Sequence, residues 1–161
     1  MDTQHAKKII GRAERIQFLD FSDQLVPAKV DTGADISSVW VSDIQEQDGE
    51  LSFTLFGAGS AYYKGETIRL PHKKFKLTRV ANSFGAKESR YVVKLRIRVG
   101  GRIVKTTFTL ADRSSKIYPV LLGQRLLKNK FLVDVTQGEP LKQAEKARRK
   151  KLLIELDQNE D

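Results

Sequence analysis

Cysteine is absent from this 161-residue sequence, which excludes disulfides, thiolate metal sites and a cysteine nucleophile. Histidine is scarce: the sequence contains only His5 and His72, which are far apart. It has no His-Glu-x-x-His motif of the kind that binds zinc in metalloproteases. The stretch "GAGSAYYKGET" at residues 57–67 lacks the Gly-Lys-Ser/Thr ending of a Walker A loop. We therefore expect no metal ion, no ATP and no other cofactor.

Long apolar runs are also missing. No stretch approaches the ~20 apolar residues of a membrane span, and the first residues lack the apolar run of a signal peptide. We expect a cytoplasmic protein without a membrane partner. The length favours one folded domain, which we assign to residues 1–138, followed by a charged tail at 139–161 that is either helical or disordered.

Charge is unevenly distributed along the chain. The net charge is +9, yet residues 1–63 hold 5 basic and 10 acidic residues, whereas residues 64–130 hold 18 basic and 3 acidic ones. Such a basic segment suggests an acidic partner, which could be nucleic acid, an anionic surface or an acidic peptide. A solvated basic face of a sheet would explain the same composition.

Most segments have the residue pattern of β-strands. In residues 90–99, apolar side chains alternate with basic ones over ten positions, as in a sheet with one wet face. Gly100-Gly101 predicts a hairpin turn, and the segment "FLVDV" at 131–135 is expected to close the sheet. The sequence predicts a mainly β fold, a small closed barrel with one short helix near 124–130 and a charged C-terminal helix.

The strand-like segment 26–30 runs directly into Asp31-Thr32-Gly33. In such a turn the aspartate accepts backbone hydrogen bonds, and glycine permits close approach of a second backbone or a substrate. The threonine hydroxyl can tie the loop to a second copy of itself. An ordinary Asx turn after a strand is the alternative.

About 90 residues later, "YPVLLGQRLL" places apolar residues before Gly123 and a short helix. Retropepsins have this pair of features, and in them the apolar-Gly strand crosses behind the Asp-Thr-Gly loop. A flap hairpin is then expected between the two, with arms near 74–80 and 89–93 and a tip at 81–87 that bends at Gly85. An ordinary polar loop would fit the same residues.

Three stretches together resemble the RimB-like family of retropepsin-like aspartic endopeptidases, which also carries the label ATP-dependent zinc protease. These are "AKVDTGADISS" at 28–38, "FTLADRSSKIYPVLLGQRLL" at 108–127 and "FLVDV". The resemblance implies a six-stranded acid-protease-like barrel. It also implies a role tied to the oligoglutamate tails that an ATP-grasp ligase adds to a ribosomal protein.

The resemblance assigns roles by position. Asp31, Thr32 and Gly33 are the expected catalytic loop. The residues expected to bind substrate are Ala34, Asp35, Arg79, Gly85 and Arg90, and those expected to support the site are Arg113, Leu122, Gly123 and Arg125.

One departure concerns the support of Asp35. Retroviral-type enzymes have an arginine directly after this glycine, which braces the equivalent aspartate. Here Gln124 follows Gly123, so the brace could be Arg125, one place late, or Arg113. Asp35 could equally be a plain surface carboxylate.

An aspartic peptidase needs two carboxylates that share a proton and activate a water. Asp112 and Asp134 could supply the second, but neither precedes Thr/Ser-Gly. We therefore expect a homodimer that brings two Asp31 residues together, acting on an acidic peptide or a glutamate-tailed ribosomal protein. The alternative is a non-catalytic module whose basic face binds acidic peptide or RNA.

Overall fold

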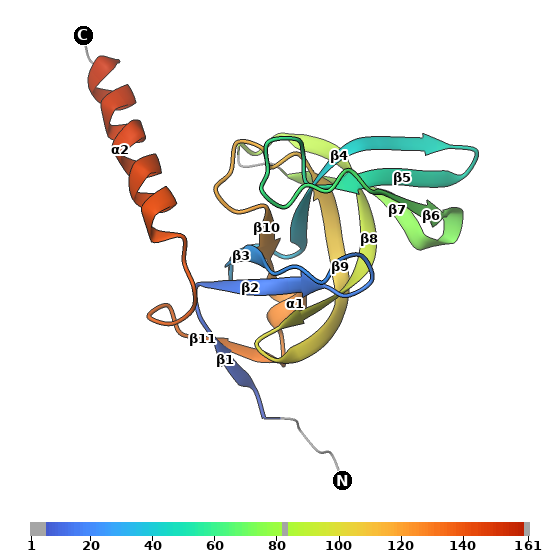
Figure 1. Cartoon of the computed structure of the whole chain (residues 1–161), viewed down its shortest axis with the longest axis horizontal. Coiled ribbons are helices and arrows are strands. Elements are labelled where there is room, and N and C mark those ends of the chain that lie inside the picture. The colour runs from blue at the N-terminus through green and yellow to red at the C-terminus, as the bar shows by residue number, and fades with distance from the viewer. Residues whose placement is uncertain (1–5, 82–83, 160–161) are drawn as a thin grey trace.

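The computed structural model describes residues 6–81 and 84–159. Its body consists of strands, and one long helix extends away from it (Figure 1). The strands are β1 (Lys8–Ile10), β2 (Ala13–Phe18), β3 (Val26–Val30), β4 (Ser37–Gln47), β5 (Glu50–Leu55), β6 (Thr67–Pro71), β7 (Phe75–Ala81), β8 (Lys87–Val99), β9 (Arg102–Ala111), β10 (Val120–Leu122) and β11 (Phe131–Val133). The helices are η1 (His72–Lys74), α1 (Gln124–Leu127) and α2 (Lys142–Gln158). The expectation of a mainly β fold is confirmed.

Six strands close a ring in the order β10, β3, β2, β8, β9, β4 and back to β10. Closure depends on β10, which pairs in parallel with β3 on one side and antiparallel with β4 on the other. Because every strand of the ring has two neighbours, none of the six leaves a full unpaired edge. The β5–β6 pair extends the sheet beyond β4, and β7 pairs with β8.

The core fills the inside of this ring. Side chains that are almost fully inaccessible come from most strands, including Phe18, Phe53, Phe108 and Ile97. On β8 the buried positions alternate with exposed basic ones, as the period of two predicted. The turn at Gly100-Gly101 is also confirmed, since both glycines have the positive φ that a two-residue hairpin requires.

The strand β10 crosses behind the loop that follows β3. Leu122 pairs with Val30, and the next residue, Gly123, passes beneath residues 34–36. A Cβ atom on Gly123 would lie 2.8 Å from the carbonyl oxygens of Ala34 and Ile36. The Gly123 amide instead donates a hydrogen bond to the buried Ser37 Oγ at 3.0 Å. Glycine is required here for space, so that the two backbones can approach.

One sequence expectation about strands was wrong. The "FLVDV" segment does not close the main sheet, because β11 pairs in parallel with β1 in a separate two-stranded sheet. This strand is short, and its pairing partner lies far away in the sequence.

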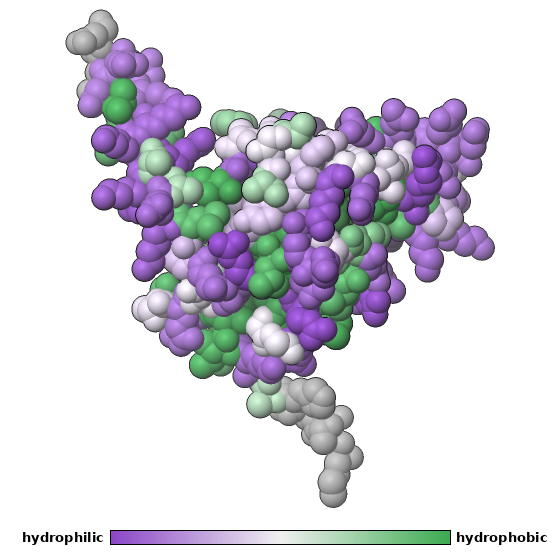
Figure 2. Space-filling view, viewed as in Figure 1, coloured by the Kyte–Doolittle hydropathy of each residue, from purple (hydrophilic) through white to green (hydrophobic). Residues whose placement is uncertain are grey.

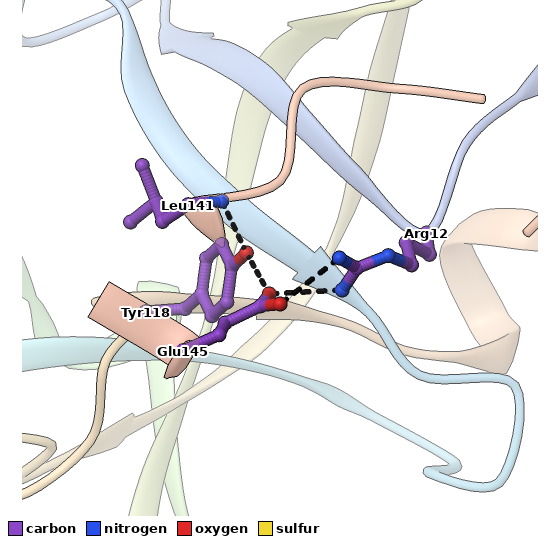
Figure 3. Close-up of polar contacts among 4 residues, drawn as sticks. All are labelled: Arg12, Tyr118, Leu141 and Glu145. Carbon is purple, nitrogen blue, oxygen red and sulfur yellow. Dashed lines mark hydrogen bonds and ion pairs between the residues drawn. The ribbon is translucent and has the colours of Figure 1, made fainter. Parts of the chain in front are cut away.

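The C-terminal helix α2 extends away from the body (Figure 1), and its hydrogen bonds to the described body come from its first two turns. Glu145 accepts two hydrogen bonds from the Arg12 guanidinium, each 2.9 Å long, and a third from the Tyr118 hydroxyl at 2.6 Å. The same hydroxyl accepts the Leu141 amide at 2.8 Å (Figure 3). We call these four residues the Tyr118 clamp. The helix buries no side chain, so this polar cluster takes the place of an apolar contact.

Beyond its first turns α2 is mostly hydrophilic on the visible face (Figure 2). Leu153 and Leu156 near its end are 62% and 61% exposed. Over residues 6–81 and 84–159, neither α-helix combines the length and the apolar character needed to cross a bilayer.

We predict that Gly123→Ala destabilises the fold by on the order of 1–3 kcal/mol, the usual cost of overpacking. The φ of Gly123 is −101°, which alanine tolerates, so the loss would come from the backbone contacts alone. Urea denaturation measures the change. The control is Lys128→Ala, at an exposed position just after α1 whose side chain has no hydrogen bond or ion pair with a described residue, and it is expected to cost less. Equal stability of Gly123→Ala and the unaltered protein would contradict the tight crossing.

We predict that Glu145→Ala releases α2 from the body. Amide hydrogen exchange over residues 142–158 should rise strongly while the ring strands keep their protection, since an isolated helix of this length is marginal in water. Glu155→Ala is the matched control, because within the described chain the ion pair of Glu155 is with Lys151, at 3.8 Å on the same helix. Unchanged exchange in α2 of the Glu145 variant would show that the clamp does not hold the helix.

Acid should loosen the same contact. Hydrogen bonding from Arg12 lowers the pKa of Glu145, with further lowering by Tyr118, against an opposing effect of burial. The carboxylate therefore stabilises docking at pH values above the ordinary glutamate pKa of about 4.3, and that contribution disappears as the pH falls through the lowered value. Exchange in α2 measured down a pH series, corrected for intrinsic rates, checks this.

Candidate functional site

Asp31 lies at the end of β3 in a turn that its own side chain organises. Its Oδ1 accepts hydrogen bonds from the amides of Gly33 at 2.9 Å and Ala34 at 3.2 Å. Its backbone amide donates to the carbonyl of Leu122 at 2.9 Å, which ties the turn to β10. Oδ2 has no hydrogen bond within the described residues. One carboxylate oxygen is therefore fixed by the backbone and the other remains available to a reactant.

The start of α1 supports this turn from below. The Gln124 side-chain amide donates to the carbonyl of Thr32 at 2.7 Å. The Gln124 backbone amide donates to the carbonyl of Ala34, also at 2.7 Å. The Arg125 amide reaches the carbonyl of Asp35 at 3.1 Å. Gln124 therefore binds the loop backbone at the position where retroviral-type enzymes have an arginine.

The structure pairs Asp35 with Arg125 and not with Arg113. The Arg125 guanidinium contacts both oxygens of Asp35, at 3.0 and 3.4 Å. The two side chains are 67% and 52% exposed, so the pair contributes at most about 1 kcal/mol to stability. Its effect is to orient the loop and the helix relative to each other.

A cleft of about 610 Å³ opens beside Asp31. One wall is the Asp31 loop, the opposite wall is the β7–β8 hairpin, and the segment after β9 forms a third side. The charged residues that line it are Asp31, Asp35, Arg79, Arg90, Asp112, Arg113, Lys116 and Arg125. A smaller cavity of about 290 Å³, near Phe21 and Phe56, does not include Asp31. We place the candidate site in the larger cleft because a functional carboxylate, a hairpin and convergent cations meet there.

The hairpin lies where the sequence predicted a flap. Its register pairs Ala81 with Lys87 and Arg79 with Ser89, so the expected arms and tip match β7, the connecting turn and β8. Thr78, Arg79 and Val80 line the cleft. Gly85 is at the tip with φ +78° and is not among the lining residues, and Asn82 and Ser83 are outside the described residues.

Arg113 is a partly buried cation of the cleft. Its Nε donates to the Tyr118 carbonyl at 3.1 Å. Burial lowers its pKa, nearby Arg90 lowers it further, and the negative charge of Asp31 acts in the opposite direction. Arg90 itself forms an ion pair with Glu88. Arg113 forms no ion pair within residues 6–81 and 84–159, which leaves its guanidinium able to bind a carboxylate.

The two other aspartates considered as partners of Asp31 have local roles. Asp112 lines the cleft, and hydrogen bonds from the Ser114 side chain and backbone lower its pKa. Asp134 does not line the cleft and binds Thr136 and Gln137, which also lower its pKa. Both carboxylates are therefore engaged by neighbouring residues of their own loops.

The remaining expected site residues lie below or beside the cleft. Thr32 is exposed and its hydroxyl makes no hydrogen bond with any described residue, whereas Leu122 is fully buried. Sequence reasoning missed several lining residues, among them Lys116 and Ser38. Ser38 Oγ is buried without a hydrogen-bond partner in the described chain. Both lie inside the quoted stretches, but their direction depends on β4 and on the loop after β9.

The zinc label of the family finds no matching ligands here. Among the described residues, no three of His, Cys, Asp and Glu gather in a way that could hold a metal ion. The His72 ring lies edge-on to Phe75, with the centroids 6.0 Å apart. The residues present do not fit a zinc site.

The chain is similar to known proteins in both sequence and structure. Over 136 residues the chain is 32% identical to two proteins named probable alpha-L-glutamate ligase, from Shewanella pealeana and Shewanella halifaxensis. These matches cover 82% of this chain but only 29% of the relatives, so the chain spans less than a third of their length. A crystal structure of a Legionella pneumophila protein of unknown function superimposes with a TM-score of 0.62 at 25% identity, covering 83% of this chain and 97% of that one.

Residues 9–143 match the family described as retropepsin-like aspartic endopeptidase RimB. The matched range includes the Asp31 loop, the hairpin, β10 and the first two residues of α2. The retropepsin-like resemblance of the sequence is thereby confirmed. The chain belongs to the RimB-like family of retropepsin-like aspartic endopeptidases.

Proposed function

We propose that this protein is an aspartic peptidase that cleaves acidic peptide, with an active site completed by a second copy of the chain. The observation on which this rests is Asp31, with one oxygen held by two backbone amides and the other without a partner among the described residues, beside a cleft lined by five cations. Family membership supports the class of reaction.

The chemistry would be general acid–base catalysis by two carboxyl groups that share one proton. The charged carboxylate takes a proton from a water, whose oxygen attacks the scissile carbonyl carbon. The protonated carboxyl donates its proton to the carbonyl oxygen, which gives a neutral tetrahedral diol. The carboxyl that took the water proton then gives it to the amide nitrogen, while one diol hydroxyl gives its proton to the other carboxylate. The C–N bond breaks, a carboxylic acid and an amine leave, and the pair again holds one proton.

A second copy is the most economical source of the second carboxyl. The described chain contains one Asp-Thr-Gly loop, and Asp112 and Asp134 are engaged by their own neighbours. A two-fold axis beside the loop would bring two Asp31 side chains together. The exposed Thr32 hydroxyl would then contact the loop of the other copy. This would account for a hydroxyl that has no hydrogen bond within its own described chain.

The charges of the cleft favour a substrate rich in carboxylates. Arg79, Arg90, Arg113, Lys116 and Arg125 outnumber the acidic residues of the cleft, and Arg113 has no ion-pair partner among the described residues. The relatives named glutamate ligase contain a region like this chain within a longer protein. A glutamate tail, such as one added to a ribosomal protein, is therefore the substrate that we propose.

A basic cleft would also suit a non-catalytic module that binds RNA or acidic peptide. The two functions separate experimentally, because only the peptidase requires the Asp31 carboxylate. Binding that persists in Asp31→Asn without any cleavage by the unaltered protein would favour the module, and steep weakening with salt would point to RNA.

We predict that Asp31→Asn lowers the rate of oligoglutamate cleavage by at least about 10³-fold, the scale of general acid–base catalysis. Mixing with the unaltered protein tests the shared site. In an equimolar, fully exchanged mixture about one quarter of the dimers keep both aspartates, so the activity per unaltered chain should fall to about half. Asp112→Asn serves as the control.

If activity in the mixtures stays proportional to the unaltered protein, each chain has a complete site and the dimer proposal fails. If Asp112→Asn is then as inactive as Asp31→Asn, Asp112 is the second carboxyl. If Asp31→Asn cleaves the peptide at the normal rate, the peptidase proposal itself fails. A contaminating peptidase is excluded by heating the sample. Cleavage activity should be lost over the same temperature range in which this protein unfolds.

A further inference from the structure

A second basic cavity adjoins the cleft on the side of α2. It has a volume of about 330 Å³ and lies between the segment 113–118, the exposed side of β3 and the first turns of α2. Its charged lining consists of Arg12, Lys29, Arg113, Lys116, Glu145 and Arg148. We call it the α2 pocket.

The cations of the α2 pocket are largely uncompensated. Glu145 is the one acid in the lining, and both of its oxygens are already bound by Arg12. Lys29, Lys116 and Arg148 form no ion pair with any described residue, and the Arg148 guanidinium only reaches the Ser115 carbonyl at 3.4 Å. The pocket therefore presents positive charge to whatever enters it.

The pocket and the cleft share two lining residues. Arg113 and Lys116 line both, so one guanidinium and one ammonium stand at the junction between Asp31 and the α2 pocket. Arg113 is fixed there by the Tyr118 carbonyl, to which its Nε donates. A carboxylate bound at the junction would have further cations on both sides of it.

The helical wall of the pocket is held rigidly. The Tyr118 hydroxyl binds Leu141 and Glu145 at the start of α2 (Figure 3). The Tyr118 carbonyl accepts the hydrogen bond from Arg113. Burial and the hydrogen bond to Glu145 raise the pKa of Tyr118, which keeps the hydroxyl protonated and able to donate near neutral pH. One buried residue therefore positions both the junction and the wall.

We infer that the α2 pocket is an exosite for the acidic peptide, and that it binds glutamate residues several positions away from the bond at Asp31. The bound segment would run from the cleft past Arg113 and Lys116 toward Lys29 and Arg148. Affinity would therefore depend on the length of the acidic tail, because only a long tail would reach the cations at α2. This inference rests on the peptide substrate of the proposed function.

Peptides of two lengths test the exosite. Chains of about four and about twelve glutamates reach roughly 13 and 40 Å when extended, so only the longer one would span both cavities. Binding of each labelled peptide is measured by fluorescence anisotropy in the Asp31→Asn background, where no cleavage interferes. Cleavage by the unaltered protein is measured separately, so that failure of the exosite and failure of the peptidase can be told apart.

In the Lys29→Gln/Arg148→Gln variant we expect affinity for the long peptide to fall on the order of threefold to tenfold, the range of two exposed charge contacts. Affinity for the short peptide should change less than about twofold. The matched control is Arg98→Gln/Lys128→Gln, which removes the same charge from exposed residues outside the cavities described above and outside the clamp. It should affect the two peptides equally.

Equal losses for both peptides, or a loss no greater than in the control, would overturn the exosite. Unchanged binding of the long peptide would do the same. Hydrogen exchange in α2 confirms that the variant keeps the helix docked. Arg113→Gln should weaken both peptides, since Arg113 stands at the junction; loss for the long peptide alone would place the short one elsewhere and contradict the continuous track.

Discussion

The crossing of β10 behind the Asp31 loop is the contact on which the rest of the molecule depends. This three-residue strand closes the ring by pairing with β3 and β4 at once, and its last carbonyl accepts the Asp31 amide. Gly123 then allows the backbone to pass beneath residues 34–36, where no larger residue fits. The same few atoms therefore complete the fold and position the carboxylate, so stability and the site share one constraint.

Around that crossing, the supports of the loop come from the backbone more than from charge. Gln124 and the first amides of α1 bind the carbonyls of Thr32, Ala34 and Asp35. The Asp35–Arg125 pair is exposed and weak by comparison. Because these hydrogen bonds support the loop, the other arginines of the cleft are not needed for its support and can bind a ligand. A half-buried Arg113 without an ion-pair partner among the described residues is costly to keep unless an anion binds it.

Much of the site follows from local sequence, because its key features are short and contiguous. An apolar strand before Asp-Thr-Gly, apolar residues before Gly123 and the alternation along residues 90–99 each specify their own geometry. The hairpin at 75–99 was predictable for the same reason. The error at β11 arose where a short strand pairs with a distant segment, since three residues contain too little pattern to select a partner.

The sequence by itself determined that Asp31 ends a buried strand, that one Asp-Thr-Gly loop is present, and that the positive charge is concentrated in residues 64–130. Only the tertiary structure decided which cations meet at Asp31 and which of two arginines pairs with Asp35. It also joined Arg12, Tyr118 and Glu145, which are up to 133 positions apart, into the clamp that docks α2. Side-chain chemistry is local, but charge pairing depends on distance in space, and the closed ring sets those distances.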